Sequence, residues 1–312
     1  MSTKWLPAEM PDQSGRIAVV TGANSGLGRI VARELAARGA NLVLACRDEA
    51  KGRSTAKEIK AARPAAKIQV VALDLADLSS VRSFSERFRA GHDRLDLLVN
   101  NAGIMAAPYA RTADGFELQL GTNHLGHFAL TGLLLGALKE QPGARVVTVS
   151  SMAHLGGLIE FSDLTGERHY SRWRAYAQSK LANLLFAFEL ARRLEAARSN
   201  AASVAAHPGW AATNLQFNAP PPHERLLLRF VLNPLIAQSE EMGALPILYA
   251  ATMPGVASGS FIGPDRLGGF RGYPTPVRAS ASANNPELAR RLWQVSEELT
   301  GVRYDLPSAK AA

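Results

Sequence analysis

The sequence of 312 residues predicts an α/β fold: a single-domain, doubly wound parallel sheet with helices on both faces. Three observations support this prediction. Short apolar runs of strand length alternate along the chain with longer segments of helical periodicity. A glycine-rich turn, Gly22 to Gly28, joins the first apolar run to the first helical segment. No internal repeat and no linker divides the chain, so one domain accounts for its length.

The elements follow one another in a regular order. Strands are predicted at 17–20, 41–45, 68–73, 95–99, 145–149, 203–206 and 259–262. Helices are predicted from Leu27 onward and at 48–62, 78–89, 116–138, 239–251 and 286–299, with another that opens at Tyr176 and continues through Phe188. We expect residues 1–14 to form an N-terminal extension, residues 15–301 the domain, and residues 302–312 a C-terminal tail. Residues 214–238, rich in proline and bulky apolar side chains, form either a covering lid or a buried hairpin of helices.

Composition excludes several classes of protein. Charged residues make up 20% and hydrophobic residues 47%, which is typical of a globular chain. The net charge is +8, but the basic residues are scattered rather than gathered in blocks with aromatic residues, so we do not expect nucleic-acid binding. The longest uncharged apolar run, Phe128 to Leu138, is shorter than the roughly 20 residues of a membrane span.

The expected location follows from the one cysteine and from the N-terminus. Cys46 cannot form an internal disulfide, which suits a reducing compartment. Residues 1–16 lack the apolar core of a signal peptide. We therefore expect a soluble, cytoplasmic protein.

The glycine turn has the spacing G-x-x-x-G-x-G, with Gly22, Gly26 and Gly28 at the corner between strand and helix. Without β-carbons the chain can turn tightly and a pyrophosphate can approach the backbone, while the helix N-terminus offers unpaired N–H groups. The turn therefore predicts a dinucleotide site. Its candidate residues are Gly22, Asn24, Ser25, Gly26, Leu27 and Gly28.

The end of the second strand bears on the choice between NAD and NADP. An acidic residue there takes the ribose 2′-hydroxyl of NAD, whereas an arginine accommodates the 2′-phosphate of NADP. Here the strand ends in Ala45 and Cys46, with no carboxylate, and Arg47 follows. Arg47 is either a solvated loop residue or a charge-assisted contact to a 2′-phosphate, and we favour the second. A helix that starts at Asp48 would carry Asp48 and Glu49 away from the ribose.

Four later patterns carry further chemistry. Asn100 to Gly103 follows the fourth strand and is either a plain turn or part of the site. His124 and His127 have helical spacing, but no Cys, Glu or Asp stands at ligand spacing, so no metal site is expected. Ser150 and Ser151 end the fifth strand without the G-x-S-x-G elbow of a hydrolase. Tyr176 and Lys180 lie one helical turn apart on one face.

Taken in order, these motifs resemble those of the short-chain dehydrogenase/reductase family over about residues 15–301. The resemblance implies a Rossmann fold and a catalytic tetrad of Asn123, Ser151, Tyr176 and Lys180, with Asn123 holding a proton-relay water. It also implies contacts to the cofactor. The residues expected to contact the cofactor are Asp74 and Leu75 at the adenine, Asn101, Ala102 and Gly103 at the adenosine side, Tyr176 and Lys180, and Pro208, Gly209 and Thr213 at the nicotinamide. Asp74 is alternatively a helix N-cap. The family places its substrate loop at 214–238.

Within that family the chain is most similar to the branch of retinal-reductase-like and protochlorophyllide-reductase-like enzymes. Leu44 to Arg47, Thr122 to Phe128 and Gln178 to Asn183 carry this similarity. The sequence departs from the branch in two ways. The apolar N-terminal anchor of membrane-bound retinal reductases is missing, and Ser25 stands where many NADP users have a basic residue.

The resemblance predicts an NADP(H)-dependent carbonyl reductase that interconverts a lipophilic aldehyde or ketone and its alcohol. Tyr176 would be the general acid and base, Lys180 would lower its pKa, and Ser151 would stabilise the developing alkoxide. The expected partner is this small-molecule substrate, and a homo-oligomer is possible. An NADP-binding regulatory or scaffold protein, or a nucleotide-sugar epimerase or dehydratase, is the alternative. A lipophilic pocket is expected from Leu155, Leu158, Ile159, Phe161, Trp173, Trp210 and Phe217.

Overall fold

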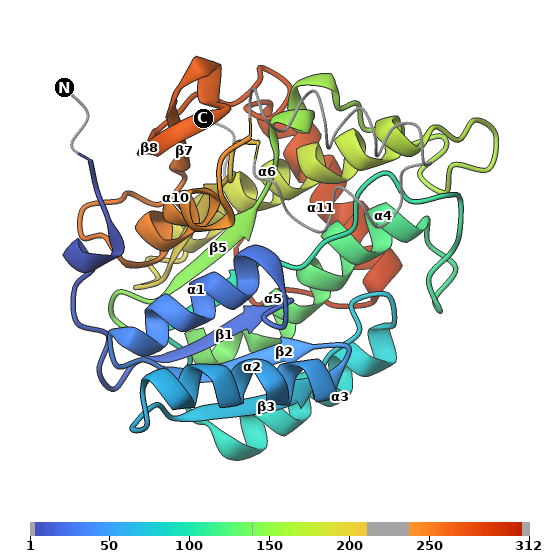
Figure 1. Ribbon diagram of the computed structural model, residues 1–312. Coiled ribbons are helices and arrows are strands. Elements are labelled where there is room, and N and C mark those ends of the chain that lie inside the picture. Colours follow the sequence, from blue (N-terminus) through green and yellow to red (C-terminus); the bar gives the residue numbers. More distant parts are fainter. Residues whose placement is uncertain (1–3, 139, 211–236, 308–312) are drawn as a thin grey trace.

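The computed structural model describes residues 4–138, 140–210 and 237–307. Over these residues the chain forms one eight-stranded sheet in the order β3-β2-β1-β4-β5-β6-β7-β8 (Figure 1). The strands are β1 Ile17–Thr21, β2 Asn41–Cys46, β3 Ile68–Ala72, β4 Leu97–Asn100, β5 Arg145–Val149, β6 Ala202–Ala206, β7 Phe261–Arg266 and β8 Arg271–Pro276. All neighbours pair in parallel except β7 and β8. The predicted doubly wound parallel sheet is confirmed.

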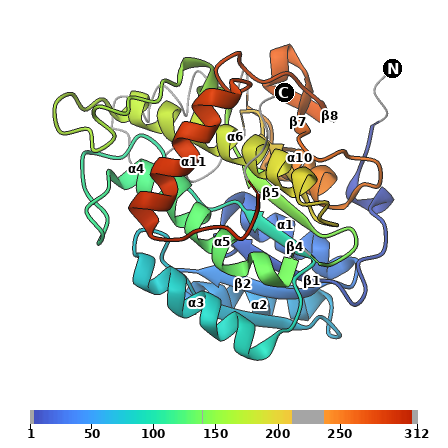
Figure 2. The ribbon, with the colours of Figure 1, turned by 180° about the vertical axis from the view of Figure 1, so that it is seen from behind.

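Helices cover both faces of the sheet. One face carries α1 Gly26–Ala37, α2 Glu49–Ala62 and α10 Glu240–Thr252 (Figure 1). The other carries α3 Leu78–Gly91, α5 Gly126–Leu138 and α6 Arg172–Ala196, and α11 Pro286–Thr300 packs against α5 and α6 (Figure 2). The central strands are therefore buried on both sides, which explains why β1 and β4 read as continuous apolar runs rather than as alternating patterns.

Two hydrophobic cores lie on opposite faces of the sheet. The first joins β1 and β2 to α1, α2 and α10, with Leu35 and Leu248 completely buried. The second joins β4 and β5 to α3, α5, α6 and α11, and Trp293 is one of its largest side chains. In it the Trp293 ring contacts the rings of Phe128 and Phe186 with centroids 5.1 and 5.8 Å apart. This second core fixes the helix that carries Tyr176 and Lys180.

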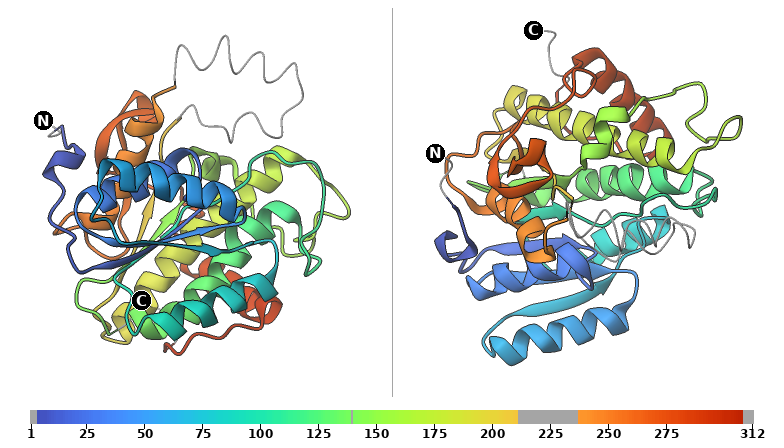
Figure 3. Two further views of the ribbon diagram at one scale, coloured as in Figure 1. Left: turned by 60° about the horizontal axis from the view of Figure 1, so that its bottom comes forward. Right: turned by 45° about the horizontal axis from the view of Figure 1, so that its top comes forward.

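Segments near both ends of the chain also enter these cores. Figure 3 shows the N-terminal segment beside the orange α10. In this segment Trp5 is buried, and its ring meets that of Tyr249 on α10 edge-on at 5.4 Å. At the other end, Val302 and Tyr304 are buried, and the Tyr304 hydroxyl donates to Phe128 O at 2.6 Å. Residues on both sides of the expected 15–301 domain therefore pack against it.

The structure differs from the expected elements in three places. The helix expected over 116–138 is present from Leu118 to Leu138, but a π-helical turn at Gly121–Leu125 separates the short α4 Leu118–Leu120 from α5. The helix expected to open at Tyr176 begins one turn earlier, at Arg172. The strand β8 has no counterpart among the expected elements; it is an edge strand that pairs only with β7, a position where Pro274 and Pro276 are tolerated.

None of the helices among the described residues combines the length and apolar character needed to cross a bilayer.

Candidate active site

The candidate residues gather where the parallel strands end. Gly22 follows β1, Asn101 follows β4, Ser151 follows β5 and Pro208 follows β6. Strand order reverses between β1 and β4, since β2 lies on one side of β1 and β4 on the other. In open α/β sheets this switch point, at the carboxyl ends of the strands, is where ligands bind. The topology thus brings distant segments of the sequence to one edge.

The glycine turn is shaped by close backbone packing. Gly22 has φ +66°, and its N–H donates to Ala45 O at 2.8 Å. A β-carbon at Gly28 would lie 2.4 Å from Gly22 O and 2.6 Å from Asn101 Nδ2, so α1 can approach β1 only because that position is glycine. Ser25 is the N-cap of α1, yet its side chain makes no capping hydrogen bond. N–H groups at the start of α1 are thereby left for an anion, and the cradle fits a dinucleotide pyrophosphate. Asn24, Gly26 and Leu27 complete the turn.

At the adenosine side, Arg47 is exposed directly after β2. Asp48 is the N-cap of α2 and accepts from Lys51 N at 3.0 Å, so its carboxylate is engaged by its own helix. Asp74 accepts from Ala76 N at 3.0 Å, and Leu75 beside it is buried. The alternative role of Asp74 as a helix N-cap is wrong, because Asp77 caps α3 instead.

The turn after β4 is fastened to the end of β1. The Asn101 side-chain amide donates to Thr21 O, while the N–H groups of Asn101 and Ala102 both donate to Thr21 Oγ1, each at 2.9 Å. A β-carbon at Gly103 would lie 3.1 Å from Asn123 Oδ1 and 3.4 Å from Lys180 Nζ. This turn therefore joins the glycine cradle to the catalytic candidates.

Asn123 lies in the π-helical turn, a kind of irregularity that is frequent at functional sites. Its side chain bridges two segments: Nδ2 donates to Ile104 O and to Ser179 Oγ, and Oδ1 accepts from Ile104 N at 2.8 Å. Ser179 lies on α6 between Tyr176 and Lys180. Asn123 thus connects the β4 turn to the helix that carries the other two candidates.

Ser151, Tyr176 and Lys180 lie together in the interior. The Ser151 side chain lies close enough to the Tyr176 hydroxyl to act on its pKa, and Ser151 Oγ accepts from Ala153 N at 3.2 Å. Lys180 Nζ lies 5.7 Å from the centre of the Tyr176 ring and donates to Val149 O at 3.3 Å. The structure therefore brings all four sequence-predicted tetrad residues to one place.

Burial shifts the pKa values of the two titratable members. In the protein alone, burial raises the pKa of Tyr176 to about 12, and the Ser151 side chain acts in the opposite direction. Burial lowers the pKa of Lys180 to about 8. Since burial disfavours a charged group, it favours the neutral form of both residues. The Tyr176 pKa is therefore raised in the protein alone, rather than lowered as expected from Lys180.

Two histidines beside the tetrad have structural partners. His127 Nδ1 lies 3.0 Å from Asn123 O, and its Nε2 lies 2.9 Å from Thr21 Oγ1. His124 Nε2 lies 2.9 Å from Ser296 Oγ on α11. Burial lowers the pKa of His127 to about 4 and that of His124 to about 3, so both rings are neutral hydrogen-bonding groups.

The turn after β6 closes the site on the nicotinamide side. Gly209 has φ +66°, and a β-carbon there would lie 2.4 Å from Phe270 O. Pro208 O accepts from Gln238 Nε2 at 2.7 Å. Thr213, Phe217 and most of the expected substrate loop at 214–238 lie outside the described residues.

The region after Ser151 differs from the expected lipophilic wall. Ile159 is buried, and the half-buried Phe161 packs against the same core beside α6. Leu155, Leu158 and Trp173 are exposed. Of these, Trp173 lies next to the catalytic candidates, with its ring centre 6.3 Å from that of Tyr176.

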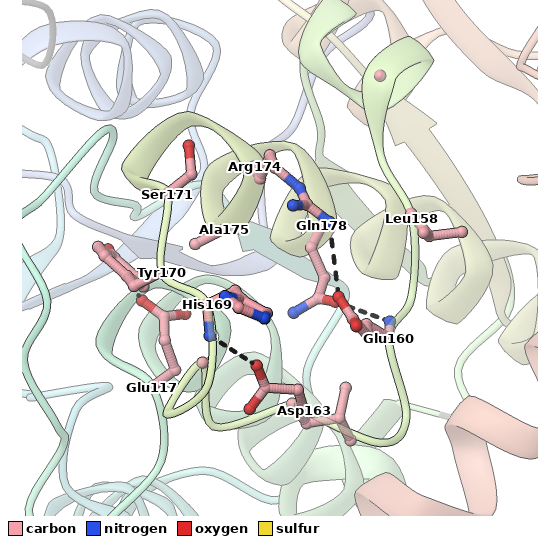
Figure 4. A pocket seen from close by; sticks show the side chains of 13 residues that line it. Glu117, Leu158, Glu160, Asp163, His169, Tyr170, Ser171, Arg174, Ala175 and Gln178 are labelled. Atoms are coloured by element: carbon pink, nitrogen blue, oxygen red, sulfur yellow. Dashed lines mark hydrogen bonds and ion pairs between the residues drawn. The ribbon is translucent and has the colours of Figure 1, made fainter.

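A hollow in this region has polar walls (Figure 4). Ala175 and Gln178 line it from α6, and an ion pair joins Arg174 to Glu160 at its rim. Ala175 and Gln178 are three residues apart and share one face of α6. Tyr176 and Lys180 are four residues apart and share a different face of the same helix. The hollow therefore lies behind the catalytic helix rather than above Tyr176.

Comparison with known proteins agrees with this geometry. Residues 16–223 match the family model of the short-chain dehydrogenases. The chain belongs to the short-chain dehydrogenase family. Family members bind NAD(P), and this one is an oxidoreductase of the retinol-dehydrogenase-like branch, a group that interconverts alcohols and carbonyl compounds.

Two curated relatives are similar over nearly the whole chain. Human retinol dehydrogenase 12 is 44% identical over 295 residues, covering 93% of this chain and 88% of its own. Mouse polyprenol dehydrogenase is 43% identical over 308 residues, covering 95% and 87%.

Two solved structures share the fold. An uncharacterised protein from Mycobacterium paratuberculosis is 46% identical with a TM-score of 0.82, covering 97% of this chain and 100% of its own. A Beutenbergia cavernae protein, described as an NAD(P)-dependent gluconate 5-dehydrogenase and solved with NADP at low occupancy, is 28% identical. Its TM-score is 0.62, and the match covers 80% and 95% of the two chains.

Sequence reasoning missed the residues that support the tetrad from a distance. Ile104 and Ser179, which hold the Asn123 amide, showed no signal in the sequence. His154 does have a signal in the sequence, because it stands three residues after Ser151. In a short 3-10 helix a side chain at that spacing can reach back to the residue that starts the turn.

Proposed function

We propose that the protein interconverts a lipophilic aldehyde or ketone and its alcohol with NADP(H), and that Tyr176 is the general acid and base. The observation that carries the proposal is the assembly of Asn123, Ser151, Tyr176 and Lys180 beside the glycine cradle, at the switch point of the sheet. An NADP-binding scaffold would not need an intact tetrad, and a nucleotide-sugar epimerase usually has a different glycine spacing.

We propose that the glycine turn and Arg47 hold the cofactor. Gly22 and Gly28 let the turn and α1 pack closely against β1 and the Asn101 turn, and N–H groups at the start of α1 would receive the charge of the pyrophosphate. Arg47 is exposed at the tip of β2, where a 2′-phosphate would be recognised. When bound, the cofactor supplies or accepts a hydride at the nicotinamide.

The protein's own part in the chemistry is proton transfer. A neutral Tyr176 phenol can donate its proton to a carbonyl oxygen as that oxygen gains electrons. Ser151 Oγ already accepts from Ala153 N, so its hydroxyl hydrogen is free to donate toward Tyr176 or the substrate oxygen. In the oxidation direction Tyr176 must give up its proton first, and positive charge from Lys180 and from an oxidised nicotinamide favours this.

The proposed substrate class rests on the apolar side chains near Tyr176 and on the relatives. Trp173 presents an exposed ring beside Tyr176, and Leu155 is exposed on the turn after Ser151. The named activities of the two curated relatives concern retinol and polyprenol, both lipophilic alcohols. The buried thiol of Cys46 suits the reducing cytoplasm that we propose as the location.

Oxidation of NADPH and NADH with decanal, retinal, an aromatic ketone and acetaldehyde tests the proposal. We expect turnover with NADPH and higher kcat/KM for the bulky carbonyls. The variant Arg47→Ala should bind NADPH about 10- to 100-fold more weakly, since one charge-assisted bond contributes ~1.5–3 kcal/mol, and should bind NADH as before. Arg53→Ala, on the exposed side of α2, is the matched control. A preference for NADH or for acetaldehyde would contradict the proposal, and no turnover of any compound would favour the scaffold alternative.

A further inference from the structure

His154 is a buried histidine that the proposed chemistry does not use. It belongs to the short 3-10 helix Met152–Gly156 and lies three residues after Ser151, with only 1% of its surface exposed. Its Nδ1 lies 2.7 Å from Ser151 O. Its Nε2 lies 3.3 Å from the backbone N of Ser280, which is 126 residues further along the chain. Both ring nitrogens are therefore engaged, one of them by the catalytic serine.

The two partners determine the state of the ring. The N–H of Ser280 can only donate, so Nε2 accepts, and Nδ1 carries the hydrogen that it donates to Ser151 O. A protonated imidazole would put two N–H groups face to face at Ser280. Burial lowers the pKa of His154, which agrees with this neutral tautomer.

Packing holds the ring in place. His154 meets the ring of Phe261 on β7 edge-on, with centroids 5.5 Å apart. The His207 ring also contacts Phe261, with centroids 5.0 Å apart, and His207 is the titratable group that interacts with His154. The His207 Nδ1 accepts from Gly209 N at 3.2 Å, so this second ring holds the turn on the nicotinamide side.

The peptide of Ser151 needs such an external support. Ser151 lies between the end of β5 and the 3-10 helix, in extended conformation with φ −154° and ψ 158°. Its carbonyl accepts from both the backbone N–H and the ring of His154. The orientation of this peptide sets the direction of the Ser151 Cα–Cβ bond, and hence where the hydroxyl lies relative to Tyr176.

We infer that His154 is a positioning residue for the proposed reaction: it fastens the Ser151 turn to the segment around Ser280 and thereby aims the Ser151 hydroxyl at Tyr176. This inference rests on the proposed function of Ser151 and Tyr176. The segment around Ser280 connects β8 to α11, so the C-terminal part of the chain takes part in the geometry of the active site.

Three variants test the inference in the full-length protein. His154→Phe keeps a ring against Phe261 and removes both hydrogen bonds. His154→Asn keeps a donor near the position of Nδ1. Ser151→Ala removes the hydroxyl itself, and the double variant Ser151→Ala/His154→Phe completes a cycle. The assay is reduction of decanal with NADPH and oxidation of decanol with NADP⁺ over a range of pH.

We expect His154→Phe to lower kcat about 10- to 100-fold while the Kd for NADPH stays within about twofold, and His154→Asn to recover much of the loss. In the Ser151→Ala background, His154→Phe should lower kcat almost no further, because the effects of two residues that act through one another are not additive. The groups that act on the Tyr176 phenol are Ser151 and Lys180. The apparent pKa for decanol oxidation should therefore rise in His154→Phe as it does in Ser151→Ala.

Additive losses of kcat in the double variant, or an unchanged pH profile in a His154→Phe protein of lower kcat, would overturn the inference.

Amide hydrogen exchange gives a test that needs no substrate. In His154→Phe the peptide around 150–157 should exchange faster while the middle of α6 is unchanged, and equal rates at 150–157 would overturn the inference as well. If His154→Phe does not fold, the same measurements on His154→Asn and His154→Gln decide. A wild-type protein without turnover would refute the proposed function, whereas the exchange result bears on His154 alone.

Discussion

Tyr176 and Lys180 lie one helical turn apart, and burial drives their pKa values in opposite directions. The phenol moves up to about 12 and the ammonium down to about 8. Each shift favours the neutral form, but a pKa of about 8 leaves Lys180 mostly protonated at neutral pH, while the phenol keeps its proton. At neutral pH the protein alone therefore holds a phenol that is ready to donate a proton.

The first prediction concerns the hydroxyl of Tyr176. In Tyr176→Phe we expect kcat to fall by ~10²–10⁴-fold, the usual contribution of a positioned acid or base, while NADPH binding is nearly unchanged. The ring remains, so packing against Trp173 is kept. Tyr109→Phe, at an exposed tyrosine, is the control. If Tyr176→Phe lowered the melting temperature and the cofactor affinity together, and activity fell only in proportion to these losses, the role of Tyr176 would be structural.

The second prediction concerns the cost of burying Lys180. Folding lowers its pKa from 10.5 to about 8, so between these pH values the unfolded lysine holds a proton that the folded one has lost. Stability therefore rises with pH through this window, and below pH 8 folding bears the full cost of at most about 3 kcal/mol. Lys180→Met should be more stable than wild type at pH 7, by an amount that shrinks as the pH rises above 8. Its turnover and NADPH binding should both be impaired.

Urea unfolding at pH 7, 8 and 9.5 measures this difference. The carbonyl of Val149 loses the Lys180 donor in the variant but still accepts from Asn183 Nδ2 at 3.0 Å, so no new unpaired group offsets the gain. Lys57→Met, at an exposed position on α2, should show no gain that depends on pH. A Lys180→Met protein that is less stable than wild type at pH 7 would contradict the prediction.

At the scale of elements, β1, α1 and the turn after β4 behave as one unit. Thr21 receives three hydrogen bonds from Asn101 and Ala102, and Gly28 packs against Gly22 and Asn101. The cofactor cradle therefore depends on how closely one helix approaches two strands. A change in this spacing should affect binding before it affects the distant helices.

The third prediction tests this close approach. In Gly28→Ala the new methyl group would lie 2.4 Å from Gly22 O, a backbone atom that cannot move alone, so α1 must shift away from β1. Overpacking of this kind costs about 1–3 kcal/mol, and NADPH affinity should fall with stability. Gly136→Ala on the exposed side of α5, where nothing lies within 4 Å, should be neutral or stabilising by up to ~1 kcal/mol. Urea unfolding and NADPH titration of both variants provide the comparison. A Gly28→Ala protein with unaltered stability and NADPH affinity would refute the prediction.

At the scale of the molecule, the C-terminal part of the chain closes the fold over the catalytic elements. The helix α11 packs against α5 and α6, Ser296 bonds His124 in the π-helical turn, and Ser280 bonds His154 next to Ser151. The expected 15–301 boundaries of the domain leave out Tyr304, whose ring lies 4.5 Å from that of Trp293. We propose that the segment up to Tyr304 folds with the domain.

The fourth prediction tests this closure. Trp293 fills the space between Phe128, Phe186 and Tyr304, and the guanidinium of Arg193 lies 4.3 Å from the centre of its ring. Removal of a buried tryptophan typically costs about 3–5 kcal/mol, so Trp293→Ala should unfold at much lower urea, whereas Trp293→Phe should lose less. Leu299→Ala, at an exposed position of the same helix, should change the free energy of unfolding little. Equal effects at 293 and 299 would show that α11 does not close the core.

Most elements were predictable because their signals are local. Strand β5 was placed at its observed ends, and β1, β2, β3, β6 and the helices α2, α3, α10 and α11 within about two residues, since apolar periodicity and caps act over a few positions. The π-helical turn at Gly121–Leu125 could not be seen, because α5 after it is buried at consecutive positions from Gly126 to Thr131 and so has no helical period that an added residue would visibly shift. The edge strand β8 was missed because only its partner β7 makes it a strand.

The sequence by itself determined the chemical groups of this protein and their order along the chain. A glycine turn, an arginine after β2, a Tyr and Lys one turn apart and a Ser at a strand end are short-range patterns, and they indicated an oxidoreductase of the short-chain family. Only the tertiary structure decided which distant groups meet: Asn123 with Ile104 and Ser179, His154 with Ser280, and α11 with the π-helical turn. It also decided the pKa values of Tyr176 and Lys180, because burial is a property of the whole fold and not of a residue's neighbours in sequence.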